Sequence, residues 1–73
     1  MYIMGHSLQL QTILMDKDLF SLKQARAWLK KHDYKRGVDS KGEFYHFRQL
    51  DPHKGAIYVT KKIAPGIEFV LFR

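Results

Sequence analysis

The chain has 73 residues, in which 13 Lys and Arg outnumber 7 Asp and Glu, giving a net charge of +6 without any cysteine. This length permits one small domain that buries roughly 60% of its unfolded surface. The lack of cysteine excludes disulfides and thiolate zinc sites. A hydrophobic content of 45% is too high for a disordered basic tail, and no apolar run approaches the length of a membrane span. The charge balance favours an acidic partner.

The first seven residues differ in character from the rest of the chain. They lack the positive start and the continuous apolar core of a secretory signal. No repeat, linker or low-complexity tract interrupts the sequence that follows. We therefore expect a loosely ordered leader over residues 1–7 and a single domain over residues 8–73.

The first two expected elements are a strand and a helix. Residues 8–14 alternate in the period-two pattern of a half-buried strand. Ser21 lies three residues before Gln24, a capping-box spacing in which each side chain bonds a free backbone N–H. The helix that begins there carries an apolar stripe opposite a basic face. The stripe contains Leu22, Ala25, Trp28, Leu29 and His32.

Three stretches with strand character follow the helix. They cover residues 43–50, 56–63 and 67–72, and turn-forming residues at 51–55 and 65–66 separate them. Residues 34–38 carry a weaker strand signal. The sequence therefore predicts an α+β domain in the order β-α-β-β-β, with one helix packed on a mostly antiparallel sheet of three to five strands.

Since one helix covers only one face of a sheet, the strand pleat divides the side chains into two sets. A register slip of one residue would exchange the sets. We expect the inner set, packed on the helix, to be Tyr45, Phe47, Ile57, Val59, Ile67, Phe69 and Leu71. The other set mixes aromatic and basic residues and contains Phe44, His46, Arg48, Tyr58, Thr60, Lys62, Val70 and Phe72.

Three motifs in order resemble a small viral domain. They are SLKQARAWLKKH at residues 21–32, YHFRQ at 45–49 and PGI at 65–67. The pattern A-x-x-W-L-x-x-H, then F-R-Q, then a turn and G-I is similar to domains encoded by tailed bacteriophages and large eukaryotic DNA viruses. The resemblance covers most of the chain. It implies a viral source and a fold, and it attaches no biochemical activity.

Two residues depart from the pattern of that viral domain. Asp33 occupies a position where such sequences usually have Gly in a left-handed conformation that closes the helix. His46 stands where relatives often have Arg, so a fixed positive charge is replaced by a titratable one.

The basic residues cluster on and after the helix. Residues 23–36 contain six basic residues and one acid, Asp33, for a net charge of +5. This cluster favours contacts with a phosphate backbone, although it also fits a solvated helix face with a favourable dipole. The candidate nucleic-acid-binding residues are Lys23, Arg26, Lys30, Lys31, Lys35, Arg36, Arg48 and Lys62.

The aromatic residues of the second sheet face allow three interpretations. They form a stacking platform for single-stranded bases, pair with one another across strands, or lie under the leader or a second copy of the chain. The candidate aromatic interface consists of Phe44, His46, Tyr58 and Phe72.

The sequence offers no motif for catalysis, metals or cofactors. His6, His32, His46 and His53 lack metal-ligand spacing. The serines are assigned to the leader, a helix cap and a turn, and no nucleophile elbow or Gly-rich phosphate loop is present. We therefore expect a protein that is not an enzyme and has no cofactor.

Two functions remain open. The first is a virus-encoded accessory protein that binds nucleic acid through its basic helix and its aromatic and basic sheet face. The alternative is a protein-interaction module, either a virion component or an early factor that binds and redirects a host protein. Its partner would be an acidic protein or a second copy of the chain, and no membrane is involved. The expected location is the cytoplasm of the infected cell or the virion.

Overall fold

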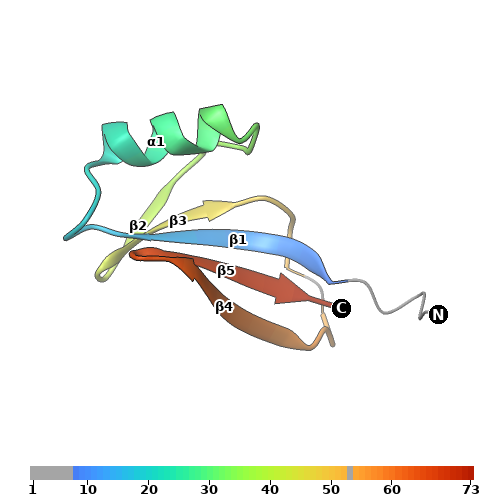
Figure 1. Ribbon diagram of the computed structural model, residues 1–73. Helices are drawn as coiled ribbons and strands as arrows, with labels where there is room; N and C mark the ends of the chain where they lie inside the picture. The colour runs from blue at the N-terminus through green and yellow to red at the C-terminus, as the bar shows by residue number, and fades with distance from the viewer. Residues whose placement is uncertain (1–7, 53) are drawn as a thin grey trace.

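The computed structural model describes residues 8–52 and 54–73, so the expected leader lies outside the described residues. One helix crosses one face of a single sheet, which confirms the α+β class (Figure 1). The elements in chain order are β1 (Gln9–Asp16), α1 (Leu22–Lys31), β2 (Asp39–Lys41), β3 (Phe44–Arg48), β4 (Tyr58–Ala64) and β5 (Ile67–Phe72).

The sheet has five strands in the spatial order β2-β3-β1-β5-β4, and every neighbouring pair is antiparallel. The predicted order β-α-β-β-β is wrong in one respect, because four strands follow the helix rather than three. The extra strand, β2, also lies beyond the weak signal at residues 34–38. Its three residues, Asp39, Ser40 and Lys41, are polar and exposed, so no apolar alternation marked them as a strand.

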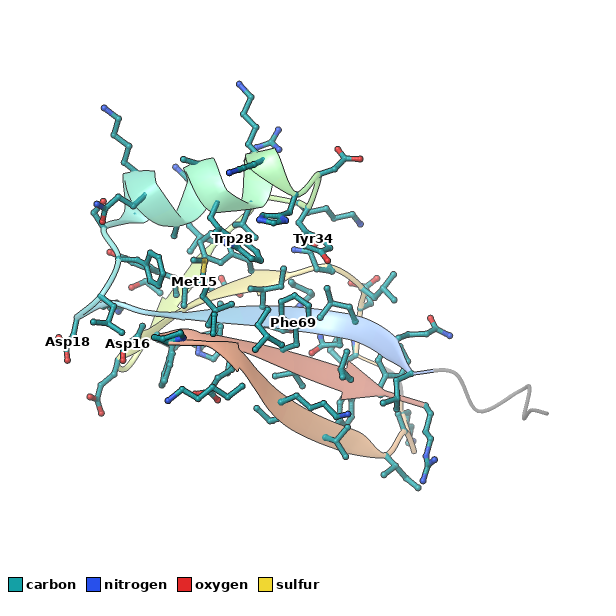
Figure 2. All side chains as sticks on the ribbon, viewed as in Figure 1. Met15, Asp16, Asp18, Trp28, Tyr34 and Phe69 are labelled. Atoms are coloured by element: carbon teal, nitrogen blue, oxygen red, sulfur yellow. The ribbon has the colours of Figure 1, made fainter. Side chains whose placement is uncertain are left out.

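The core lies between α1 and the central strands (Figure 2). Ile13 of β1 is paired with Phe47 of β3 on one side and with Phe69 of β5 on the other. Trp28 and Tyr34, which are half-buried, pack against the core from the helix and the segment after it. The fully buried side chains are Ile13, Met15, Ala25, Leu29 and Phe47.

The register confirms most of the predicted division between the two faces. Tyr45, Phe47, Ile67 and Phe69 belong to the helix-side core. Val59 pairs with Leu71 and so lies on the predicted face. The predicted packing on the helix is wrong for Ile57 and Val59, which are 60% and 40% exposed. The sheet twists, so its outer strand β4 curves away from the short helix, which covers the central strands only (Figure 1).

The turn between β4 and β5 depends on Gly66. Its φ of 79° is the positive value that a type II turn requires at its third residue, as the Pro65–Gly66 pair predicted. A Cβ added to Gly66 would lie 2.7 Å from Leu19 Cδ1 and 3.0 Å from Phe20 Cε2. The turn therefore packs directly under the segment that leads into α1.

We expect Gly66→Ala to destabilise the domain by more than about 2 kcal/mol, because a strained φ and a close contact add together. Gly55→Ala is a matched control, since Gly55 has the same φ of 79° and nothing within 4 Å of an added Cβ. Urea unfolding of both variants measures the difference. Equal losses of stability would show that the packing at Leu19 and Phe20 contributes nothing.

Candidate nucleic-acid interface

Helix α1 begins at the predicted capping box. The backbone N–H of Gln24 donates to Ser21 Oγ at 3.1 Å, and the N–H of Ser21 donates to Gln24 Oε1 at 2.9 Å. These two bonds satisfy donors that a helix start leaves without partners. The start of the helix, and with it the direction of every side chain on α1, is therefore set locally.

Helix α1 is followed by a residue in the left-handed conformation. Asp33 has a φ of 62°, and the N–H of Tyr34 donates to the carbonyl oxygen of Leu29 at 2.9 Å. The ring centroids of Trp28 and His32 lie 4.1 Å apart over this last turn. Asp33 thus closes the helix as Gly would, although a left-handed φ is less favourable for Asp.

The solvent face of α1 carries four exposed cations. The buried residues Ala25 and Leu29 fix the opposite face against the core. Spacings of three and four residues place Lys23, Arg26 and Lys30 in one row along the helix, with Lys31 beside it; all four side chains are exposed. Lys23 and Lys30 are seven positions apart, which is about 10 Å of helix rise. Figure 2 shows long nitrogen-tipped side chains projecting from α1 away from the sheet.

Lys35 and Arg48 are brought together by a buried glutamine. Gln49 accepts from the backbone N–H of Lys35 at 2.8 Å and donates to the carbonyl oxygen of Lys35 at 3.0 Å. The same amide donates to the carbonyl oxygen of Phe47 at 3.2 Å. Lys35 and Arg48 consequently line one hollow of about 200 Å³, together with Asp51. Exposed Arg36 follows directly in the same segment.

Lys62 lies away from the other candidate cations. It belongs to β4, at one edge of the sheet, whereas Arg48 lies on β3, next to the opposite edge strand β2. Lys62 also faces Glu68 across the β4–β5 pair, so an opposite charge offsets it. The structure therefore divides the predicted set into two parts. The first, called here the helix surface, consists of Lys23, Arg26, Lys30, Lys31, Lys35, Arg36 and Arg48. The second is Lys62 alone, on β4.

The aromatic set lies on the face of the sheet opposite the helix. Phe44 and His46 are half-buried, and Phe72 is only 4% exposed. Tyr58 is 41% exposed, and its ring centroid lies 5.8 Å from that of Phe72. The four side chains do share a face, but most of their surface is not open to a base. Arg48 follows His46 by two residues on β3, so it shares this face, and both side chains line one hollow with Val38 and Asp39. The cations of α1 lie on the other side of the sheet, so one strand of nucleic acid would have to cross a sheet edge to reach them as well.

Burial lowers the pKa of His46 below its ordinary value of 6.5, and the nearby positive charges of Lys41 and Lys17 lower it further. Asp39, which pairs with His46 across the β2–β3 ladder, opposes this shift. The lowered pKa favours the neutral form of the His46 ring at pH 7.

We expect His46 to make the domain less stable in mild acid. The pKa of His46 is lower in the folded state than in the unfolded chain, so the folded state binds fewer protons in mild acid. The free energy of unfolding therefore decreases as the pH falls through about 6.5. Urea unfolding at pH 7.5 and pH 5.5 measures the loss, which should be small because the ring is partly exposed. His46→Gln should reduce the difference between the two pH values, and an unchanged difference would contradict the assignment.

The remaining candidate groups do not converge on a further site. His6 and His53 lie outside the described residues. Within residues 8–52 and 54–73, no group of three His, Asp or Glu side chains is arranged to hold a metal ion. Nor is any helix of this part of the chain long and apolar enough to cross a membrane.

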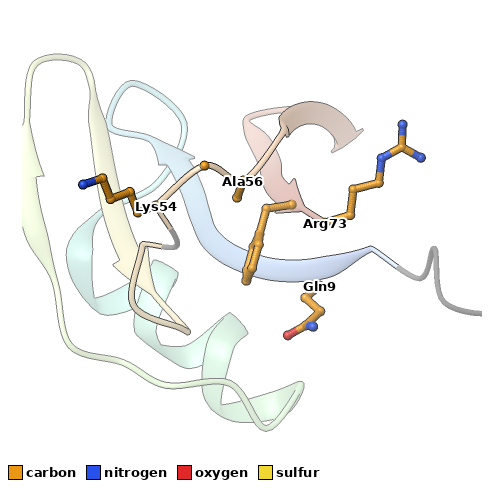
Figure 3. Close-up of a pocket in the computed structure, with 6 residues that line it drawn as sticks. Gln9, Lys54, Ala56 and Arg73 are labelled. Carbon is orange, nitrogen blue, oxygen red and sulfur yellow. The ribbon is translucent and has the colours of Figure 1, made fainter.

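A pocket of about 280 Å³ lies at the end of β5 (Figure 3). Lys54 and Arg73 line it, together with Gln9, Ala56 and the ring of Phe72. The charged ends of Lys54 and Arg73 point away from one another (Figure 3), so they do not form a joint anion site. No ligand can be assigned to this pocket.

No family model matches this chain, and neither do any curated protein or solved structure. The residues of the three motifs can nevertheless be placed in the fold. Ala25, Leu29 and Phe47 are core residues, Gly66 forms the turn under Leu19 and Phe20, and Gln49 anchors the segment after the helix. These motif residues build the core, a turn and the anchor of the segment after the helix, and the exposed cations of α1 and Arg48 lie within the same motifs.

Sequence reasoning missed the role of Gln49. A buried glutamine in a predicted strand looks like an ordinary polar position, and its partners are fourteen residues away in the chain. Its position directly after Phe47 and Arg48, with an alternating strand pattern that turns it inward, was the available signal.

Proposed function

We propose that this chain is a small non-enzymatic, virus-encoded accessory protein that binds nucleic acid through the helix surface. The observation that carries this proposal is the row of Lys23, Arg26 and Lys30 on the exposed side of α1. Residues 22–32 contain no acidic residue that would neutralise the row. Lys31, at the same end of the helix as Lys30, extends the surface toward Lys35.

The chemistry of this surface fits phosphate oxygens. Arg and Lys neutralise phosphates and release the counterions that surround a nucleic acid, which is a favourable and largely sequence-independent contribution. The row is straight and about 10 Å long, so it follows one stretch of backbone. The negative end of the helix dipole near Lys30 and Lys31 opposes the anion there, so the cations themselves must supply the attraction.

Arg36, Lys35 and Arg48 extend the surface beyond the helix. Gln49 holds the backbone of Lys35 with two hydrogen bonds, so this part of the segment is fixed before a ligand arrives. Arg36 Nη1 donates to the carbonyl oxygen of Tyr34 at 3.3 Å, which leaves its other donors for a phosphate. The resulting surface contacts the sugar-phosphate backbone of the nucleic acid rather than the edges of its bases.

The aromatic sheet face plays a smaller part in this proposal than the basic helix. Only Tyr58 of its four candidates is exposed, at 41%, and base stacking needs an accessible ring. The viral source rests on the resemblance of the three motifs alone.

Fluorescence anisotropy at low salt tests the proposal. Labelled single- and double-stranded DNA and RNA of unrelated sequences should each bind with micromolar or tighter affinity, within about tenfold of one another. The failure of all four probes to bind would end the proposal. Strong preference for a single sequence would contradict phosphate contacts as its basis.

A further inference from the structure

Strand β4 forms one outer edge of the sheet and is unusually open for a strand of seven residues. Every residue from Tyr58 to Ile63 is exposed, and only Ala64 is partly buried. Three large apolar side chains along and beside the strand are exposed; these are Ile57, Val59 and Ile63. The helix surface described above lies elsewhere, so the nucleic-acid proposal makes no use of this edge.

The ladder between β4 and β5 determines which backbone groups of β4 face outward. Ile57 and Arg73 exchange two hydrogen bonds, each 3.2 Å long, so they form a hydrogen-bonded pair. Such pairs alternate along an antiparallel ladder, which directs the backbone groups of Val59 and Lys61 toward β5. The N–H and C=O groups of Thr60 and Lys62 therefore point outward, away from the sheet.

The charges of this edge favour one kind of occupant. Lys61 and Lys62 are adjacent and place a cation on each side of the strand. Lys62 faces Glu68 of β5, whereas Lys61 faces the uncharged Phe69, so Lys61 carries the larger unopposed charge. A bulge follows at residues 62–64. Lysines and bulges on an outer strand oppose pairing with a second copy of the same edge, and a chain of net charge +6 repels its own copies. A strand that carries carboxylates opposite the two lysines would instead be attracted.

We propose that β4 binds an extended acidic segment of another protein, which adds to the sheet as a sixth strand. Its backbone pairs with the outward groups of Thr60 and Lys62, its β-branched apolar residues pack beside Val59, and its carboxylates meet Lys61 and Lys62. Backbone pairing supplies affinity in this mode, and side chains at alternate positions supply selectivity.

A synthetic peptide of about eight Val and Glu residues, with Glu placed opposite the two lysines, serves as the probe. In the ¹⁵N-labelled full chain, peptide binding should slow hydrogen exchange at the amides of Thr60 and Lys62. The amides of Val59 and Lys61, which already donate within the sheet, should change much less. A peptide with Lys in place of Glu, and one N-methylated at the amides that face β4, should each bind at least about tenfold more weakly.

Two variants complete the test. Thr60→Pro removes an outward N–H without removing a bond to β5, and it should weaken peptide binding about tenfold or more. Lys61→Glu with Lys62→Glu should do the same. Circular dichroism reports whether each variant keeps its fold. Nucleic-acid binding through α1 is measured separately, so failure of this inference can be distinguished from failure of the proposed function.

Three results would overturn the inference. The first is equal binding of the N-methylated peptide. The second is protection of the Thr60 and Lys62 amides by self-association in the absence of peptide, which would make a second copy the occupant. The third is protection of those amides by an oligonucleotide and not by the acidic peptide.

Discussion

Reversal of three charges on α1, in the variant K23E/R26E/K30E, is expected to weaken nucleic-acid binding by about a hundredfold near 0.1 M salt. Each phosphate contact contributes a slope of about −0.9 for duplex DNA in a plot of log affinity against log salt. Loss of three contacts therefore removes about two to three orders of magnitude at that concentration. Anisotropy titrations of the variant and the original chain measure the change.

A matched control separates a local surface from a general charge effect. The variant K54E/K61E/K62E removes three lysines from other parts of the chain and, like the first variant, changes the net charge from +6 to zero. It should retain most of the affinity, apart from a weaker long-range attraction. Equal losses in the two variants would show that net charge alone binds nucleic acid and that the helix surface has no special role.

Phe47→Ala is expected to remove a large part of the stability of the domain, and nearly all of it if that stability lies near the lower end of the usual range. Phe47 is fully buried at the centre of the core, and truncation of such a residue costs about 3–5 kcal/mol. The stability of a domain of 73 residues is of the same order, about 4–11 kcal/mol by the usual range per residue. Far-ultraviolet circular dichroism, with the fluorescence of the single Trp28, follows the unfolding transition.

Phe44→Ala provides the comparison on the same strand. Phe44 lies three positions from Phe47 and is half-buried on the face that the helix leaves uncovered. We expect it to cost roughly 1–2 kcal/mol, since less apolar area is lost. If Phe44→Ala were the more damaging substitution, the assignment of the helix-side core would be wrong.

Much of the fold could be predicted because the decisive signals were local. Ser21 and Gln24 set the start of the helix through bonds across one turn, and the apolar stripe fixed which side is buried. Alternation within β3 and β5 gave the correct two faces, since Phe47 and Phe69 both meet Ile13. Pro65–Gly66 identified a turn whose positive φ the structure contains.

The remaining features depend on the three-dimensional arrangement of elements that are distant in the sequence. Ile57 and Val59 have the alternation of an inner strand, and they are exposed only because the outer strand twists away from a helix of ten residues. Strand β2 pairs with β3 despite its polar sequence, because a tight turn at Gly42 brings it alongside. Neither feature has a local apolar pattern to reveal it.

The candidate site was predictable to a similar extent. Charge counting identified α1 as the basic element, and helical spacing placed its cations in one row. Whether Arg48 or Lys62 joins that row depends on the strand order, which places β3 next to the segment after α1 and β4 at the far edge. The aromatic set shares a face as expected, but the burial of Phe72 could not be inferred from its own strand.

The salt dependence of affinity tests the central proposal most directly. Anisotropy titrations with duplex DNA from about 0.05 to 0.2 M salt should give a slope of about −4 to −6 for the original chain, corresponding to five to seven phosphate contacts. For K23E/R26E/K30E the slope should be smaller by about 2 to 3. A slope near zero, or one that the triple reversal leaves unchanged, would contradict phosphate binding by the row of cations on α1.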